Sequence, residues 1–371
     1  MKTVNDIKII LFDKNNKESI ITKKFLLHLK DRHIIDYSNE DELKEHIVKL
    51  QKEGYRSKEV LILKRFMGRF FQLCPGTPKM ICCNYRVINT CFNCLYNCAY
   101  CYLNTYLNSY GILQFTNIEN VFGEIENFLS KANPETIYRI GSGEFTDSLM
   151  MDEITGIGRD LIKKLNSFEN VMLELKTKSS NIDHLLEIKE KGNTVIAWSL
   201  NTQRNIDRYE NDSSSLTDRI DAAVRAGNEG YYLAFHFDPI IIYDGWKEDY
   251  RNIIDSLFQY INTDKIVWIS LGCFRYSPGF KEIIRDNFPD EELTIEEMFP
   301  GIDGKMRYLK KNRIEIYSEI IKYINKYSNR AFIYLCMESS DMWYTIFEKN
   351  YSASEELEKT FSDHLIKNFL Y

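Results

Sequence analysis

The sequence predicts an α/β fold built around a parallel sheet, together with a smaller α/β lobe that precedes it. Short apolar runs that fit strands buried on both faces alternate with segments whose apolar residues recur at helical spacing. This alternation is typical of parallel sheets, either open or closed into a barrel. The chain has 371 residues, of which 44% are hydrophobic, and this is enough for one large domain and a smaller one.

Residues 1–72 predict the smaller lobe. Its expected strands are Ile7–Phe12, His33–Tyr37 and Val60–Leu63. Its expected helices are Thr22–Lys30 and Asn39–Gln51. Thr22 is the expected N-cap of the first helix, and the second carries its apolar residues on one face. Strands and helices that alternate in this way predict a three-stranded parallel unit.

Residues 73–345 predict the larger domain, which begins at the turn-forming run Cys74–Pro78. Its expected strands are Tyr85–Asn89, Thr136–Gly141, Val171–Lys176, Thr194–Leu200, Tyr231–Phe237, Lys265–Leu271 and Ala331–Leu335. Its expected helices are Ile118–Lys131, Ile154–Leu165, Asn181–Lys189, Ser215–Gly227 and Lys247–Tyr260. Residues 346–371 have a polar, helical pattern and predict a C-terminal helical tail at the surface. In a barrel, the chemistry is expected at the C-terminal ends of the strands.

Composition and charge limit the class of protein. The net charge is −6, so the chain as a whole does not have the strongly basic character of a nucleic-acid-binding protein. The sequence has no run of about 20 apolar residues that could span a membrane. Its first residues, Met1–Asp6, lack the apolar run of a signal peptide. Nine cysteines without an export signal predict a cytoplasmic location, and metal or thiol chemistry rather than disulfides.

The most informative motif is a run of three cysteines, Cys94, Cys98 and Cys101, with the spacing C-x3-C-x2-C. Three thiolates can hold three irons of a [4Fe–4S] cluster and leave the fourth iron open to another ligand. An open position marks a catalytic rather than a structural metal site. Zinc is the alternative, but it would need a fourth ligand, commonly from a second C-x2-C pair.

Four other cysteines precede or adjoin this motif, namely Cys74, Cys82, Cys83 and Cys91. Their spacing matches no firm metal-binding pattern, so a second metal site is not the preferred interpretation.

The cysteine motif resembles the signature of the radical S-adenosylmethionine (SAM) enzymes. This resemblance implies a [4Fe–4S] cluster on the three cysteines, with SAM bound to the open iron. Reductive cleavage of SAM then gives methionine and a 5′-deoxyadenosyl radical, and the electron comes from a donor such as flavodoxin or ferredoxin. Tyr100 precedes Cys101, where an aromatic residue typically packs near the cluster and the adenine in such enzymes; simple core packing is the alternative.

Polar residues at the ends of three predicted strands are candidate SAM ligands. The turn Gly141–Asp147 contains Ser142, Glu144 and Thr146, and its small residues allow a close backbone approach. It looks like the turn that meets the amino group of SAM in this class of enzyme. Lys178 could pair with the SAM carboxylate, and Ser199 and Asn201 could hydrogen-bond the ribose and carboxylate. A surface lysine and helix-capping residues are the alternatives.

Candidate catalytic residues follow the next two strands. His236 and Asp238 should share one strand face and could orient or protonate a substrate, although a buried structural histidine is equally compatible. Cys273 could donate a hydrogen atom or serve as a core thiol. Asp303, Lys305 and Arg307 stand on a glycine-framed loop that suits a polar or anionic substrate, or caps the barrel.

Taken together, these residues resemble the spore photoproduct lyase family of radical SAM proteins. The most specific matching segments are Cys94–Tyr102, Arg139–Asp147, Thr177–Lys178, Asp183–Leu186, Ser199–Asn201 and Leu216–Tyr250. The resemblance implies an incomplete (β/α)6 TIM-type barrel with an N-terminal extension. It also implies repair of a methylene-bridged thymine dimer in spore DNA, in which a protein cysteine returns a hydrogen atom.

The sequence departs from this family where the donor cysteine is expected. Matching Arg139 and Asp147 to the family pattern places Glu144 at that position, and a carboxylate has no weak S–H bond to donate from. The preferred hypothesis is therefore a radical SAM enzyme that removes a hydrogen atom from a small molecule or peptide. The second is nucleic-acid repair or modification of the lyase type. The third is a non-catalytic iron–sulfur or zinc protein.

Overall fold

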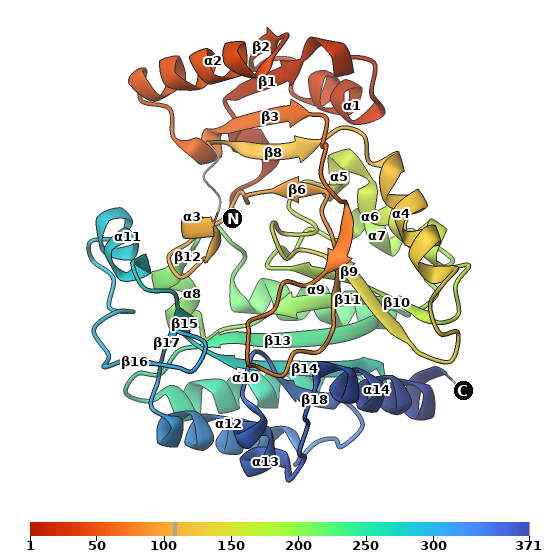
Figure 1. The fold of residues 1–371 in the computed structure, drawn as a ribbon, viewed down its shortest axis with the longest axis vertical. Helices are drawn as coiled ribbons and strands as arrows, with labels where there is room; N and C mark the ends of the chain where they lie inside the picture. Colours follow the sequence, from red (N-terminus) through yellow and green to blue (C-terminus); the bar gives the residue numbers. More distant parts are fainter. Residues whose placement is uncertain (107–109, 371) are drawn as a thin grey trace.

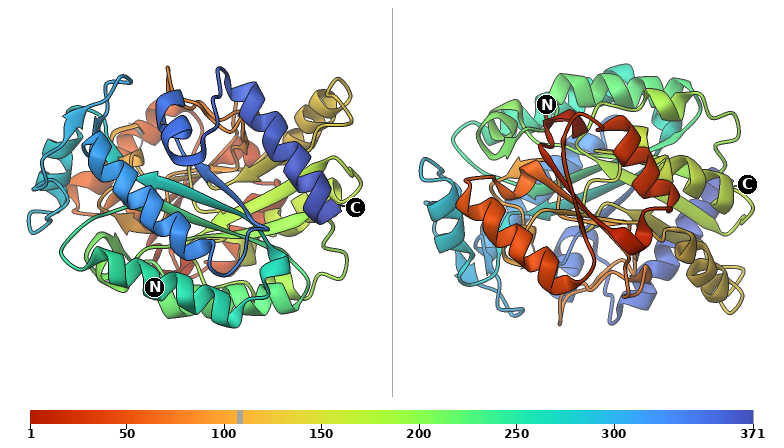
Figure 2. Two further views of the ribbon diagram at one scale, coloured as in Figure 1. Left: turned by 90° about the horizontal axis from the view of Figure 1, so that it is seen from below. Right: turned by 90° about the horizontal axis from the view of Figure 1, so that it is seen from above.

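The computed structural model describes residues 1–106 and 110–370 of the chain. Two sheets organise it, one in an N-terminal lobe and one in a larger body (Figure 1). The right-hand view in Figure 2 shows the N-terminal lobe, in red and orange, lying over the rest of the chain. The left-hand view shows helices of the C-terminal half, in green and blue, lying across the larger sheet. The predicted combination of a small and a large α/β unit is confirmed.

The N-terminal sheet has the strand order β2-β1-β3-β8-β6. Its strands are β1 (Ile9–Asp13), β2 (His33–Tyr37), β3 (Val60–Lys64), β6 (Cys91–Phe92) and β8 (Ile112–Phe115). The helices of the lobe are α1 (Ile20–His28) and α2 (Glu40–Lys52). Ser19, rather than Thr22, accepts the capping bond at the start of α1. Because β8 and β6 join this sheet, it extends beyond residue 72, and the division into lobes at that residue stays a prediction.

The larger sheet has the order β18-β14-β13-β11-β10-β9-β5-β4 and forms an incomplete, curled barrel. Its strands are β4 (Phe71–Leu73), β5 (Arg86–Ile88), β9 (Tyr138–Ser142), β10 (Val171–Thr177), β11 (Thr194–Ser199), β13 (Tyr232–Ile240), β14 (Ile266–Cys273) and β18 (Phe332–Leu335). Neighbours from β5 to β18 are parallel, and β4 pairs antiparallel to β5. The seven strands predicted for this domain are all confirmed. They are recognisable because parallel strands covered on both faces need continuous apolar runs.

The remaining elements are short strands and the helices that connect the sheet. The short strands are β7 (Asn97–Cys98), β12 (Glu210–Asn211), β15 (Arg275–Tyr276), β16 (Phe299–Pro300) and β17 (Met306–Arg307). The helices are α3 (Leu103–Tyr106), α4 (Glu119–Leu129), α5 (Asp152–Thr155), α6 (Ile157–Leu165), α7 (Asp183–Leu186), α8 (Gln203–Tyr209), α9 (Leu216–Asn228), α10 (Trp246–Tyr260), α11 (Phe280–Asn287), α12 (Lys310–Ile324), α13 (Ser340–Phe347) and α14 (Ser354–Leu365). The predicted helix at 154–165 is divided because Gly156 adopts a positive φ of 66°.

The C-terminal helix α14 is more than a polar surface element. Its residues Leu357, Phe361 and Leu365 are buried. The Phe361 ring lies edge-on to Trp268, at 5.7 Å between centroids, and stacks on Phe332 at 4.1 Å. The polar pattern of residues 346–371 therefore described only the outer face of this helix. No helix in the described part of the chain is both long and apolar enough to cross a membrane.

Candidate functional site

The cysteine run lies between the two sheets and is held by backbone pairing. β6 ends at Phe92, and Asn93 then turns the chain with a φ of 71° while its side-chain oxygen accepts from the Cys94 amide at 2.9 Å. Further on, β7 pairs antiparallel with β12, which places Cys98 opposite Glu210. The run is thus fixed to a segment more than 100 residues later in the sequence.

The three thiols share a buried and locally cationic environment. Cys98 is buried, and Cys94 and Cys101 are partly buried. Burial raises the pKa of all three thiols, and the charge of Lys58 acts in the opposite direction on each of them. Lys58 is held there because its Nζ donates to the Tyr96 carbonyl. Within residues 1–106 and 110–370, no three His, Cys, Asp or Glu side chains come together as ligands of a single ion.

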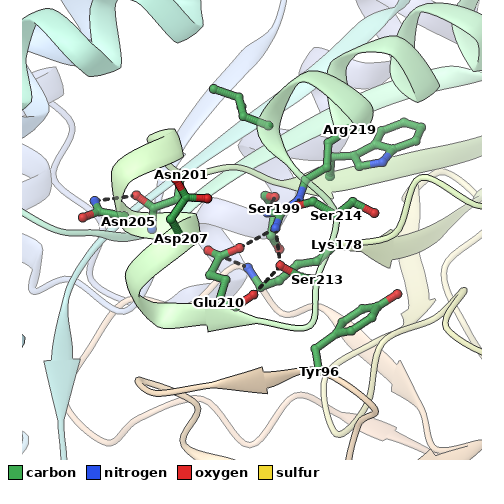
Figure 3. A network of polar contacts seen from close by, with 12 residues as sticks. Tyr96, Lys178, Ser199, Asn201, Asn205, Asp207, Glu210, Ser213, Ser214 and Arg219 are labelled. Carbon is green, nitrogen blue, oxygen red and sulfur yellow. Dashed lines mark hydrogen bonds and ion pairs between the residues drawn. The ribbon is translucent and has the colours of Figure 1, made fainter. Parts of the chain in front are cut away.

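Glu210 lies at the centre of a polar network beside the cysteines (Figure 3). Its Oε1 accepts a hydrogen bond from the Tyr100 hydroxyl and lies 3.4 Å from Nζ of Lys178. Its Oε2 lies 2.6 Å from Nη2 of Arg219, and the side chains of both Glu210 and Arg219 are 0% exposed. Burial by itself raises the pKa of Glu210, but the charges of Arg219 and Lys178 outweigh burial and lower the pKa to about 2. The carboxylate therefore stays ionised.

Arg219 connects Glu210 to the end of β11. Its guanidinium also donates to the carbonyls of Ser199 and Ser214 at 2.8 and 3.0 Å and to the Ser213 hydroxyl at 2.7 Å. The ion pair is thus supported by three neutral acceptors, as a buried charge requires.

The turn after β9 positions the start of the Lys178 segment. Asp147 accepts hydrogen bonds from the Thr177 hydroxyl at 2.7 Å and from the Lys178 amide at 2.6 Å. Burial raises the pKa of the Asp147 carboxyl group above its ordinary value, although these two hydrogen bonds act to lower it. In the same turn, the Ser142 hydroxyl donates to Ser148 at 2.9 Å, and Thr146 is buried beside Met150. Ser142 and Thr146 therefore have partners within the protein.

Ser199 and Asn201 differ in how accessible they are. Ser199 is 9% exposed, whereas Asn201 is fully buried. The Asn201 side-chain oxygen accepts from Tyr250 at 2.7 Å and from Asn205 at 2.9 Å, and its amide nitrogen donates to a carbonyl at 3.1 Å. Asn201 thus serves the packing of α8 and α10, and the structure does not bring it into the accessible part of the site.

Glu144 has one cationic partner and one aromatic neighbour. Its Oε2 lies 3.2 Å from Nζ of Lys176, with side-chain exposures of 18% and 22%. The Tyr102 hydroxyl donates to the Glu144 carbonyl at 2.8 Å. Burial lowers the pKa of Lys176, but the carboxylates of Glu144 and Glu174 raise it above its ordinary value. The side chains of Glu144 and Lys176 keep contact with solvent at the strand ends.

His236 and Asp238 do not act as one pair. Nε2 of His236 lies 2.6 Å from Oε1 of Glu174, and Trp268 donates to the same oxygen at 3.1 Å. Asp238 instead binds Arg275 through two parallel contacts of 3.1 and 3.2 Å. Both residues lie on the same strand, as predicted, but each contacts a different charged residue.

Cys273 faces away from these groups. A Cβ atom on the preceding residue, Gly272, would lie 2.6 Å from the Asp238 carboxyl carbon, so the side of β14 that carries position 272 faces the network. The next residue on a strand faces the opposite side. Cys273 accordingly lies beside Tyr317 of α12, whose hydroxyl accepts from the Cys273 amide at 3.1 Å. This geometry does not favour Cys273 as a hydrogen-atom donor at this site, and that role stays a prediction.

A different thiol reaches the inner side of the sheet. Cys336 follows β18 directly, and its sulfur lies 3.5 Å from Nη2 of Arg275. The other cysteines with no assigned role, Cys74, Cys82, Cys83 and Cys91, are free thiols. On the loop between β16 and β17, Asp303 pairs with Arg307 at 2.6 Å. This pair holds Asp303 to β17, and Lys305 of the same loop donates to the Thr77 hydroxyl at 2.7 Å.

The sequence did not single out four charged residues that organise the site, namely Glu174, Glu210, Arg219 and Arg275. Glu174 and Lys176 alternate with Leu175 and Thr177 near the end of β10. A charged residue inside an apolar strand is unusual, so this pattern was a usable signal for a functional site. Glu210 gave no such signal, because it lies outside the long strands and two of its partners, Tyr100 and Lys178, are distant in sequence.

Comparison with known proteins identifies the family. The sequence profile of the family described as "SPL: Spore photoproduct lyase" matches residues 81–336. The chain belongs to the spore photoproduct lyase family. A spore photoproduct lyase of Bacillus subtilis (strain 168) is 29% identical over 188 residues, which cover 50% of this chain and 55% of the relative. One of Clostridium acetobutylicum is 27% identical over 223 residues, covering 58% and 66%. The matched segments thus span between half and two thirds of these relatives.

Solved structures of spore photoproduct lyase share the fold. One complexed with dinucleoside spore photoproduct has a TM-score of 0.75 and 20% identity, and the match covers 89% of this chain and 98% of that one. A variant with bound AdoMet and dinucleoside spore photoproduct gives a TM-score of 0.75 at 21% identity, with the same coverage. The similarity confirms the predicted incomplete TIM-type barrel.

Proposed function

We propose that this protein is a radical SAM enzyme that holds a [4Fe–4S] cluster on Cys94, Cys98 and Cys101 and acts on a small molecule or peptide. The observation that carries the cofactor part is the arrangement of three thiols on one short run, beside a network of charges suited to a polar ligand. Membership in the spore photoproduct lyase family supports the same chemistry.

The residues present fit the cluster. Thiolates are soft ligands of the kind that iron–sulfur clusters take. Burial raises the pKa of Cys98 and Cys101, and the charges of Lys58 and Lys178 act against that rise. The same two lysines would offset the negative charge of the thiolates. The Tyr96 amide also points at the Cys94 sulfur, at 3.4 Å. When bound, the cluster together with SAM supplies a 5′-deoxyadenosyl radical.

Lys178 is the residue best placed to bind the SAM carboxylate. It lies next to the cysteine run, with its Nζ 5.6 Å from the centre of the Tyr100 ring. Its contact with Glu210 is long, at 3.4 Å, because Glu210 makes its shorter contacts with Arg219 and Tyr100. The ammonium group therefore keeps capacity for a second carboxylate. Ser199, at the end of the adjacent strand, remains a candidate ligand for the ribose or carboxylate.

The choice of substrate rests on Glu144. Its partner is Lys176, so the pair presents both charges at the strand ends where a substrate would lie. A carboxylate here cannot return a hydrogen atom to a substrate radical, and a paired Glu and Lys can instead hydrogen-bond a polar substrate. This supports a small molecule or peptide. Repair or modification of DNA is the second candidate, and the names of the relatives favour it.

Anaerobic reconstitution with iron and sulfide tests the cofactor part. The expected result is about four irons per chain and release of 5′-deoxyadenosine when the reduced protein receives SAM. Alanine at any one of Cys94, Cys98 or Cys101 should abolish that release. Cys82→Ala is the matched control and should leave the iron content and the release unchanged. An intact cluster in the variant that lacks all three cysteines would overturn the assignment.

A further inference from the structure

A polar cavity lies on the side of the cysteine run that faces the N-terminal lobe. Its volume is about 340 Å³. Its lining residues are Lys2, Arg56, Ser57, Lys58, Asn93, Asn97, Leu103, Asn104, Asp212, Asn287 and Phe288. None of the residues discussed above as SAM or substrate ligands is among them. The cavity is therefore a separate feature from the strand ends that carry Glu144, Lys178 and Ser199.

The cysteine run forms part of the wall of this cavity. Asn93 and Asn97 directly precede two of the cysteines, and Asn104 donates to the Cys98 carbonyl at 3.3 Å. Lys58 lines the cavity and also donates to the Tyr96 carbonyl, in the middle of the run. The cavity therefore adjoins the backbone that carries the three thiols.

The charge of the lining is opposite to that of the whole protein. Lys2, Arg56 and Lys58 supply three positive charges and Asp212 one negative charge, whereas the chain carries a net charge of −6. The Arg56 side chain is 79% exposed, although it also contacts Glu59 at 2.9 Å. A locally positive surface on an acidic protein favours an acidic partner and speeds its association.

We propose that this cavity is the docking site for a small acidic electron-transfer protein, which delivers the electron that SAM cleavage consumes. This inference rests on the function proposed above. In the step itself one electron leaves the reduced flavin or iron–sulfur centre of the partner and enters the cluster, and no atom is transferred. The positive lining attracts the partner, and the cysteine run behind it gives the shortest protein path that the cavity offers to the thiols.

The test compares two reductants on one set of variants. The double variant K2Q/R56Q removes two lining charges and leaves Lys58 in place. K8Q is the matched control, because Lys8 contacts the same Glu59 carboxylate at 2.8 Å but does not line the cavity. Dithionite needs no docking site, whereas flavodoxin, kept reduced by its NADPH-dependent reductase, does. Release of 5′-deoxyadenosine from SAM is measured with each reductant at low and high salt.

The double variant should keep the wild-type rate with dithionite and lose about tenfold with flavodoxin at low salt, since charges at an interface act mainly on association. High salt should shrink this difference. Binding of oxidised flavodoxin to the protein before reconstitution should weaken by a similar factor, and K8Q should match the wild type in every assay. An unchanged flavodoxin-driven rate with normal dithionite activity would overturn the docking site alone. No release with dithionite in the wild type would overturn the proposed function as well.

Discussion

The buried ion pair between Glu210 and Arg219 allows the sharpest prediction about stability. Replacing Glu210 with Gln keeps the shape of the side chain but removes its charge. Arg219 then remains fully buried with only neutral acceptors, the two carbonyls and one hydroxyl described above. The loss of one partner from a buried pair costs about 3–5 kcal/mol, because the remaining charge has no compensation.

The pKa of Glu210 gives an independent estimate of the same quantity. It falls from an ordinary value of 4.5 to about 2 in the folded protein. Since one pKa unit corresponds to about 1.4 kcal/mol, the charge stabilises the fold by roughly 3–4 kcal/mol. Because the folded pKa is the lower one, this stabilisation is present above about pH 4.5 and is lost as the pH falls toward 2.

Urea denaturation of the cluster-free protein at pH 7, followed by circular dichroism, measures the effect. We expect E210Q and R219M each to lower the free energy of unfolding by about 3 kcal/mol. The double variant should lose at least 2 kcal/mol less than the sum of the two, as contacting residues do. The difference between E210Q and the wild type should also shrink as the pH approaches 3. Additive losses, or a loss below about 1 kcal/mol in each single variant, would refute this reasoning.

Three further outcomes are expected. K178A should weaken SAM binding about tenfold or more, because it removes a charge-assisted bond of about 1.5–3 kcal/mol. An unchanged affinity in a SAM titration would show that Lys178 does not bind SAM. E144Q should keep SAM binding and lower product formation if Glu144 faces the substrate, and E144C restores a thiol at this position for a direct test of repair. E174Q should flatten the acid side of the plot of unfolding free energy against pH. Burial raises the pKa of Glu174, but His236 outweighs burial and lowers the pKa to about 2, so the stability that Glu174 adds is lost between about pH 4.5 and pH 2. An acid-unfolding curve identical to that of the wild type would contradict this.

The fold was largely predictable because its strands are fully buried. β11 and β14, for example, are buried along their whole lengths, and such strands need continuous apolar runs that stand out in the sequence. The short pairing of β7 with β12 was not predictable, because two-residue strands carry no periodic pattern. The break at Gly156 was not foreseen either, since a single glycine can also lie within a helix.

The site was predictable where chemistry follows from spacing in the sequence, and not where it depends on distant contacts. The three cysteines fall within eight residues, so their proximity is local. Glu210 and Arg219 come together with Tyr100 and Lys178 only through the sheet and the β7–β12 pairing. For Cys273, strand alternation allowed two faces, and only the position of Gly272 against Asp238 decides between them.

A single incubation separates radical chemistry from substrate choice, since we propose that this protein keeps the radical chemistry of its family but acts on a different substrate. The reconstituted, dithionite-reduced protein is incubated with SAM and dinucleoside spore photoproduct. 5′-Deoxyadenosine and the repaired thymine dinucleotide are then quantified in the same chromatogram. We predict that 5′-deoxyadenosine accumulates and that no repaired dinucleotide forms, because Glu144 cannot return a hydrogen atom. Repaired dinucleotide formed by the unmodified chain over many turnovers would contradict the account and make DNA repair its function.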